Sequence, residues 1–188
     1  MKIICLGDSL TAGYRVPPES CWVRLLDVET PHTWINAGVS GDTTAGLLVR
    51  LQTEVLPQNP DAVLIMGGSN DIALTGVCTQ AQTNLMAMVH QCVARGVRPV
   101  VGIPLPIVGI PEQWRPAASW ELAPKASQAY IRWLRAFADA FGLRNVDFAE
   151  AVAAQGGERL YQPDGLHPNV EGHRVMADAV KRRNYFLH

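Results

Sequence analysis

The sequence of 188 residues lacks a surplus of charge of either sign. Its 16 lysines and arginines are balanced by 17 aspartates and glutamates, which leaves a formal net charge of −1. Proteins that bind nucleic acid or an anionic membrane surface through their overall field carry a basic surplus. We therefore expect neither kind of partner.

Long hydrophobic runs are also missing. No stretch approaches the roughly 20 apolar residues that cross a bilayer as a helix. Met1 and Lys2 lead straight into an apolar strand pattern, without the longer apolar region and small-residue cleavage site of a secretory signal. These absences predict a protein without a transmembrane segment and with a cytoplasmic location.

The cysteines have no C-x-x-C spacing and no arrangement with histidine that would indicate zinc. We expect free thiols at all four positions, which are Cys5, Cys21, Cys78 and Cys92. The G-x-S-x-G sequence that presents the nucleophile of α/β-hydrolases is absent as well. The chemistry predicted below needs no metal and no organic cofactor.

Short apolar runs alternate with segments of helical periodicity, a pattern typical of β-α units around a parallel sheet. Strands are predicted at residues 3–6, 34–36, 62–66 and 97–103, with a short fifth strand marked by Val146 and Phe148. No repeat or linker interrupts the pattern. We therefore predict a single α/β domain over residues 1–188, a three-layer α/β/α sandwich with a central parallel sheet of about five strands.

One segment, residues 104–124, breaks this rhythm. It is rich in proline, contains Trp114 and Trp120, and follows the end of a predicted strand. Long loops of this kind are often lids or binding loops. Each tryptophan either covers an edge of the core or lines a substrate pocket, and the two interpretations are about equally supported.

Four polar, glycine-containing turns follow predicted strands or precede the last predicted helix. They lie at residues 7–13, 36–42, 67–71 and 164–169. The carboxyl ends of parallel strands meet at one edge of a sheet, which is where open α/β sheets bind ligands. We expect these turns to form one site.

The residue types in these turns suit acyl transfer. Ser9 is the predicted nucleophile, and a serine hydroxyl needs a base within hydrogen-bond reach. His167 is the predicted base, and Asp164, three residues earlier, is placed to orient the imidazole. Each motif alone has an ordinary interpretation as a turn or a helix cap. The order in which the motifs occur along the chain favours the interpretation that they form a catalytic site.

A tetrahedral intermediate also needs hydrogen-bond donors for its oxyanion. The backbone N–H groups of Ser9 and Gly41 and the side-chain amide of Asn70 are the predicted donors. Asp8 and Asp71 are next to Ser9 and Asn70 in the sequence, and we expect them to accept hydrogen bonds that hold these turns.

These four blocks resemble the SGNH hydrolases, the GDSL family of lipases and esterases, which are named after Ser, Gly, Asn and His in that order. Here the matching residues are Ser9, Gly41, Asn70 and His167, and Asp164 matches the aspartate of the D-x-x-H block. The resemblance covers residues 2 to about 180 and is strongest to the bacterial arylesterase, thioesterase and lysophospholipase branch. It implies a flavodoxin-like SGNH hydrolase fold.

The resemblance implies a serine esterase that cleaves a small-molecule acyl ester or thioester through an acyl-enzyme. Two alternatives would use the same site: an acyltransferase, and a carbohydrate O-deacetylase, which a polar pocket beneath residues 104–124 would favour. A third, a ligand-binding module without catalysis, is disfavoured by the aligned nucleophile and base.

Overall fold

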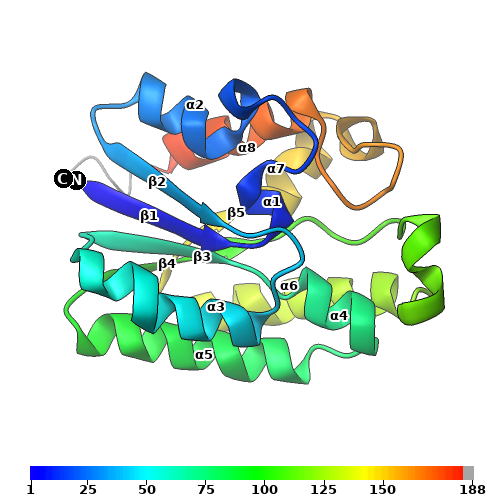
Figure 1. The fold of residues 1–188 in the computed structure, drawn as a ribbon, viewed down its shortest axis with the longest axis horizontal. Helices are drawn as coiled ribbons and strands as arrows, with labels where there is room; N and C mark the ends of the chain where they lie inside the picture. The colour runs from blue at the N-terminus through cyan, green and yellow to red at the C-terminus, as the bar shows by residue number, and fades with distance from the viewer. Residues whose placement is uncertain (184–188) are drawn as a thin grey trace.

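Five parallel strands form the central sheet of the computed structural model, which describes residues 1–183 (Figure 1). The strands are β1 (Lys2–Gly7), β2 (Thr33–Gly38), β3 (Ala62–Met66), β4 (Arg98–Ile103) and β5 (Arg144–Asp147). The predicted fold is confirmed, with one local error. Phe148 belongs to the next helix rather than to the fifth strand, because the Asp147 side chain accepts the Glu150 N–H at 2.8 Å and caps that helix.

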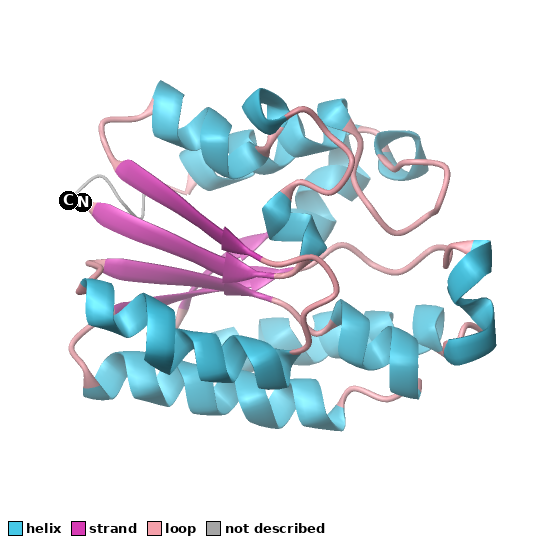
Figure 2. Cartoon of the chain, in the orientation of Figure 1, coloured by secondary structure: helices cyan, strands magenta, loops and turns pink. Residues whose placement is uncertain are grey.

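Helices cover both faces of the sheet (Figure 2). They are α1 (Ser9–Ala12), α2 (Trp22–Glu29), α3 (Thr44–Arg50), α4 (Ser69–Thr75), α5 (Thr79–Ala94), α6 (Ala123–Ala140), α7 (Phe148–Gln155) and α8 (Val170–Arg182). A π-helical turn, Leu51–Val55, extends α3. Short 3-10 helices lie at Pro18–Ser20, Leu56–Gln58, Glu112–Ala117 and Gly157–Leu160.

Alternate residues of β1 enter different cores, because successive side chains of a strand point to opposite faces. Ile4 and Leu6 pack in the core beneath α3, α5 and α6. Ile3 and Cys5 pack in the core beneath α2, α7 and α8. Figure 1 shows these two helical layers below and above the sheet. Each layer buries one face, as a parallel sheet requires.

The strand order β2-β1-β3-β4-β5 reverses direction next to β1. The chain passes from β1 to β2 on one side and returns to β3 on the other, and ligands bind such sheets at this switch point. Gly7, the last residue of β1, is in register with Gly38 of β2 and Met66 of β3. The turns that follow these three strands therefore leave the sheet at the same level.

The proline-rich segment at residues 104–124 is irregular over most of its length, as predicted, but it holds the 3-10 helix Glu112–Ala117 and ends where α6 begins at Ala123. The Ser119 N–H donates to the Ala73 carbonyl at 2.8 Å. This bond joins the segment to α4 beside the switch point.

Several buried polar groups lie in the layer that contains α2 and α8. His173 of α8 is fully buried and its Nδ1 lies 3.4 Å from the Trp22 backbone nitrogen. The Trp22 indole N–H donates to the Leu10 carbonyl at 3.0 Å, which fastens α2 to the short helix α1.

The four cysteines are free. Between residues 1 and 183, no helix is both long and apolar enough to cross a membrane.

Candidate active site

Ser9 is the first residue of α1, directly beyond the end of β1. The turn is held by Asp8, whose side chain caps the helix and accepts the Leu10 N–H at 2.9 Å. The Ser9 backbone N–H lies in the first helical turn, where such groups have no intrahelical acceptor. Ser9 is only 6% exposed. Its hydroxyl is thus presented from a rigid turn at the carboxyl edge of the sheet.

His167 lies between Ser9 and Asp164. Its Nε2 is 2.9 Å from Ser9 Oγ, and its Nδ1 is 2.7 Å from Asp164 Oδ2. The other oxygen of Asp164 accepts the N–H groups of Leu166 and His167 at 2.9 and 3.0 Å. The structure therefore brings Ser9 together with His167 and Asp164, although Ser9 and His167 are 158 positions apart in the sequence.

Asp164 sits in an environment that favours its carboxylate form. Burial by itself raises the pKa of this carboxyl, but the hydrogen bonds from the backbone and ring of His167, together with the Leu166 N–H, outweigh it. The net effect holds the pKa of Asp164 below its usual value. An ionised carboxylate at this position fixes the orientation of the His167 ring.

Gly41 and Asn70 lie in the two neighbouring turns. Gly41 has a φ of 85°, a left-handed conformation that favours glycine. Asn70 is in the first turn of α4, and its side-chain amide donates to the Asp42 carbonyl at 2.8 Å. Gly41 and Asn70 also line the same pocket, of about 310 Å³.

That pocket is largely apolar. Its other lining residues are Ala73, Leu74, Gln113, Trp114, Ala117 and Ala118. Trp114 thus reaches a cavity beside two predicted oxyanion donors. Trp120 does not line this pocket, and its ring centroid lies 5.5 Å from the Arg115 guanidinium carbon.

Asp8 and Asp71 both accept hydrogen bonds within these turns. Asp71 accepts the N–H of Thr44 at 2.9 Å and its hydroxyl at 2.7 Å, which joins α4 to the start of α3. Asp8 is fully buried, and its Oδ2 has no protein partner among residues 1–183. Burial, and to a smaller extent the charges of Asp71 and Asp42, raise the pKa of Asp8 to about 7 against the weaker effect of the Leu10 N–H.

Two contacts in the site have no signal in the sequence pattern. The ring of Tyr14 packs against the imidazole of His167. The Gln162 side-chain amide donates to the carbonyls of Tyr14 and Pro168 at 2.8 and 2.9 Å. Both contacts join the Ser9 turn to the His167 turn across more than a hundred residues. Only the folded chain brings them together.

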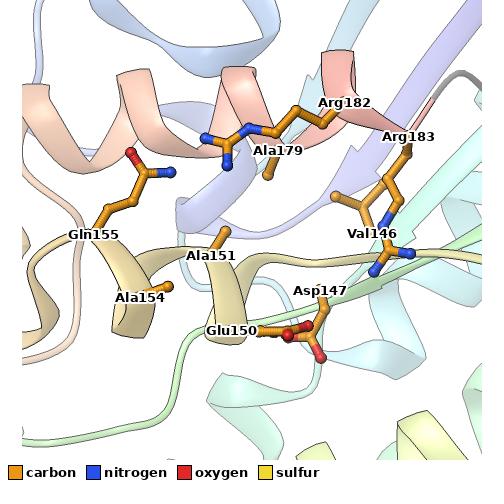
Figure 3. A pocket seen from close by; sticks show the side chains of 9 residues that line it. All are labelled: Val146, Asp147, Glu150, Ala151, Ala154, Gln155, Ala179, Arg182 and Arg183. Atoms are coloured by element: carbon orange, nitrogen blue, oxygen red, sulfur yellow. Dashed lines mark hydrogen bonds between the residues drawn. The ribbon is translucent and has the colours of Figure 1, made fainter.

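Another pocket, of about 190 Å³, lies between β5, α7 and α8 (Figure 3). Its lining consists of Val146, Asp147, Glu150, Ala151, Ala154, Gln155, Ala179, Arg182 and Arg183. It contains none of the predicted site residues. In the described part of the chain, no three His, Cys, Asp or Glu side chains are grouped so as to hold a metal ion.

Comparisons with known proteins identify the family of this chain. Residues 5–175 match the model of the GDSL-like lipase/acylhydrolase family. An arylesterase of Vibrio mimicus is 38% identical over 188 residues, covering 95% of this chain and 86% of the relative. The thioesterase 1/protease 1/lysophospholipase L1 of Escherichia coli K12 is 28% identical, covering 96% and 82% of the two chains.

A solved structure supports the same assignment. The lipase/acylhydrolase of Enterococcus faecalis superposes with a TM-score of 0.77 at 28% identity, over 98% of this chain and 95% of the other. The match of the family model, the relatives and the fold extends over nearly the whole chain. The protein belongs to the GDSL-like lipase/acylhydrolase family and is a carboxylic ester hydrolase.

Proposed function

We propose that this esterase cleaves acyl esters or thioesters with Ser9 as nucleophile, His167 as general base and acid, and Asp164 as the residue that orients the imidazole. The observation that carries the proposal is the continuous contact from Ser9 Oγ to His167 Nε2 at 2.9 Å and from His167 Nδ1 to Asp164 Oδ2 at 2.7 Å. A serine hydroxyl becomes nucleophilic when such a base can take its proton.

In acylation, Ser9 Oγ bonds to the substrate carbonyl carbon and its proton passes to His167 Nε2. The intermediate then collapses, and the bond to the alcohol or thiol breaks as His167 returns the proton to the leaving group. In deacylation, water attacks the acyl-Ser9 ester and gives a proton to His167. Release of the carboxylic acid returns this proton to Ser9 and regenerates the free enzyme.

The oxyanion of each intermediate is bound by the backbone N–H groups of Ser9 and Gly41 and by the Asn70 side-chain amide. Two facts support this. The turns that carry the three donors leave adjacent strands at the same level, and Gly41 and Asn70 line one pocket. The loss of one such donor typically lowers turnover by about 10²–10³-fold.

The acyl group occupies the pocket between Asn70 and Trp114. Its alanine, leucine and tryptophan lining suits a hydrocarbon chain, and its volume of about 310 Å³ suits short or medium acyl groups. An acetylxylan esterase of Geobacillus stearothermophilus is 34% identical over 87 residues. The apolar lining, however, favours an acyl chain over a sugar in this pocket.

We also propose that residues 1–188 form one domain, since both cores are built on the same sheet. Two further points stay predictions of the sequence. One is a cytoplasmic location, and the other is that water, rather than an alcohol, accepts the acyl group. Competing alcohols added to the assay would reveal transfer as ester products.

A fluorophosphonate probe with peptide mapping tests the proposal. We expect a single adduct on Ser9, which forms a bond from Oγ to phosphorus and releases fluoride, and turnover of p-nitrophenyl esters that Ser9→Ala abolishes. Ser127→Ala is the matched control, because Ser127 is also buried but bonds to the Pro124 carbonyl in α6. Full activity in a folded Ser9→Ala protein would overturn the mechanism.

A further inference from the structure

We propose that Arg50 is a positioning residue that sets the nucleophile turn and the oxyanion turns in their relative places. The inference rests on the proposed function, because it concerns the same turns. Arg50 is the last residue of α3 and contacts the carboxyl ends of β1 and β2, just before the turns that follow them. Its side chain is only 13% exposed.

The guanidinium group of Arg50 donates to the carboxyl ends of both strands. Its Nη2 donates to the Gly7 carbonyl at 3.1 Å, two residues before Ser9. Its Nη1 donates to the Ala37 carbonyl at 2.8 Å, four residues before Gly41. One planar group thus spans the ends of two strands, and its fork geometry fixes the distance between them.

A third contact continues toward Asn70. Arg50 Nε donates to Asp42 Oδ2 at 2.8 Å, and the backbone carbonyl of Asp42 accepts the Asn70 amide at 2.8 Å. Asp42 is therefore held by its carboxylate and in turn holds Asn70 by its carbonyl. The Arg50–Asp42 pair is charge-assisted and largely shielded from water, so it is strong and directional.

The Asp42 carboxylate is also confined on its other side. A Cβ placed on Gly46 would lie 1.8 Å from Asp42 Oδ1. Glycine at this position of α3 therefore leaves room for the carboxylate where it meets Arg50. An alanine there would displace Asp42 without removing any charge.

A second pair in this protein provides a matched control. Arg135 Nε donates to Asp147 Oδ2 at 2.6 Å, joining α6 to the end of β5. Asp147 caps α7 and lines the pocket of Figure 3 rather than the turns around Ser9. Loss of this pair removes an ion pair of the same chemistry at a different place.

The experiment measures kcat and KM on p-nitrophenyl butyrate for Arg50→Met, Arg50→Lys and Arg135→Met, together with the rate of fluorophosphonate labelling. A displacement of about 1 Å in a reacting group costs about 10²-fold in rate. We expect kcat to fall by about 10- to 100-fold in both Arg50 variants, with KM changed by less than about 3-fold and slower labelling. Arg135→Met should retain kcat within about 2-fold.

Arg50→Lys keeps the charge but cannot bridge two carbonyls and a carboxylate in one plane, so it should not restore the rate. Gly46→Ala gives an independent readout, because alanine favours a helix more than glycine does. This gain offsets part of the stability lost when the Arg50–Asp42 pair is disturbed, so the variant should fold while kcat falls. This variant keeps the inference testable even where Arg50→Met does not fold.

Folded Arg50→Lys and Gly46→Ala proteins that retain the kcat of the unmodified protein would overturn this inference. If the fluorophosphonate labels Ser9 of the unmodified protein in that case, only the proposed role of Arg50 is refuted. If Ser9 of the unmodified protein does not react, the proposed function itself fails.

Discussion

The aromatic ring of Tyr14 lies against the imidazole of His167, with centroids 4.4 Å apart and an angle of 38° between their planes. Tyr14 follows the short helix α1, so this contact links the turn that carries Ser9 with the turn that carries His167. The Arg15 guanidinium carbon also lies over the Tyr14 ring, 5.0 Å from its centroid.

We expect Tyr14→Ala to lower kcat by about 10-fold, because the imidazole loses an aromatic contact that limits its rotation. Such contacts contribute about 0.5–1.5 kcal/mol. Tyr14→Phe is the control, since it keeps the ring and removes only the hydroxyl, and its kcat should match that of the unmodified protein. Equal losses in both variants would point to the hydroxyl instead.

Trp114 is expected to limit the length of the acyl chain. It is 40% exposed and lines the pocket that holds Asn70. Trp114→Ala removes a large side chain from a cavity of about 310 Å³, so the ratio of kcat/KM for p-nitrophenyl decanoate to that for the butyrate should rise. Trp120→Ala should leave this ratio unchanged, because Trp120 stacks with Arg115 outside the pocket.

Asp8 is expected to lower the stability of the native protein at alkaline pH. Its pKa is raised from 3.8 to about 7, mainly by burial, so the native state holds a proton that the unfolded state has released. The contribution of Asp8 to the free energy of unfolding is therefore fully present below pH 3.8 and is lost as the pH rises through about 7. Asp8→Asn can still accept the Leu10 N–H without ionising.

Chemical denaturation from pH 4 to 9 tests this expectation. The free energy of unfolding of Asp8→Asn should exceed that of the unmodified protein by up to about 4 kcal/mol at pH 8, and the two should converge near pH 4. A difference that does not change with pH would show that Asp8 is not the titrating group.

The contribution of His173 to stability depends on pH in the opposite direction. Burial, with a smaller effect from His167, lowers its pKa from 6.5 to about 4, so the unfolded state binds a proton that the native state does not. The contribution of His173 to stability is present above pH 6.5 and is lost as the pH falls toward 4. At about 1.4 kcal/mol for each unit, this loss is on the order of 3 kcal/mol.

His173→Gln should flatten this acid dependence, since an amide can accept the Trp22 N–H but does not ionise. Thermal unfolding followed at pH 7 and pH 4.5 measures the difference. His90→Gln, at an exposed position of α5, is the control and should show the same acid loss as the unmodified protein.

The sheet and the proximity of Ser9, Asp164 and His167 were predictable from the sequence because both depend on local patterns. The apolar run that forms β3 has the same bounds in prediction and structure, and Ser9, Asn70 and His167 follow turns whose meeting point is set by parallel topology. The end of β5 was predicted incorrectly at Phe148, because the cap by Asp147 outweighs the apolar character of that residue.

The positions of Tyr14, Arg50 and Gln162 could not be predicted, for a common reason. Each contacts a partner in another β-α unit, and the sequence pattern around each residue describes only its own unit. Arg50 looks like an ordinary cation at a helix C-terminus, where the helix dipole favours it. Its bonds to Gly7 and Ala37 arise only from the way α3 packs over the ends of β1 and β2.

The 158 residues between Ser9 and His167 also affect how the enzyme is made. A ribosome that adds about 5–20 residues each second synthesises Ser9 roughly 8–30 s before His167. Under the mechanism proposed above, the nascent chain carries during that interval a serine without its proton acceptor. Hydrolysis then requires that the turn carrying His167 has been synthesised and has docked beside Ser9.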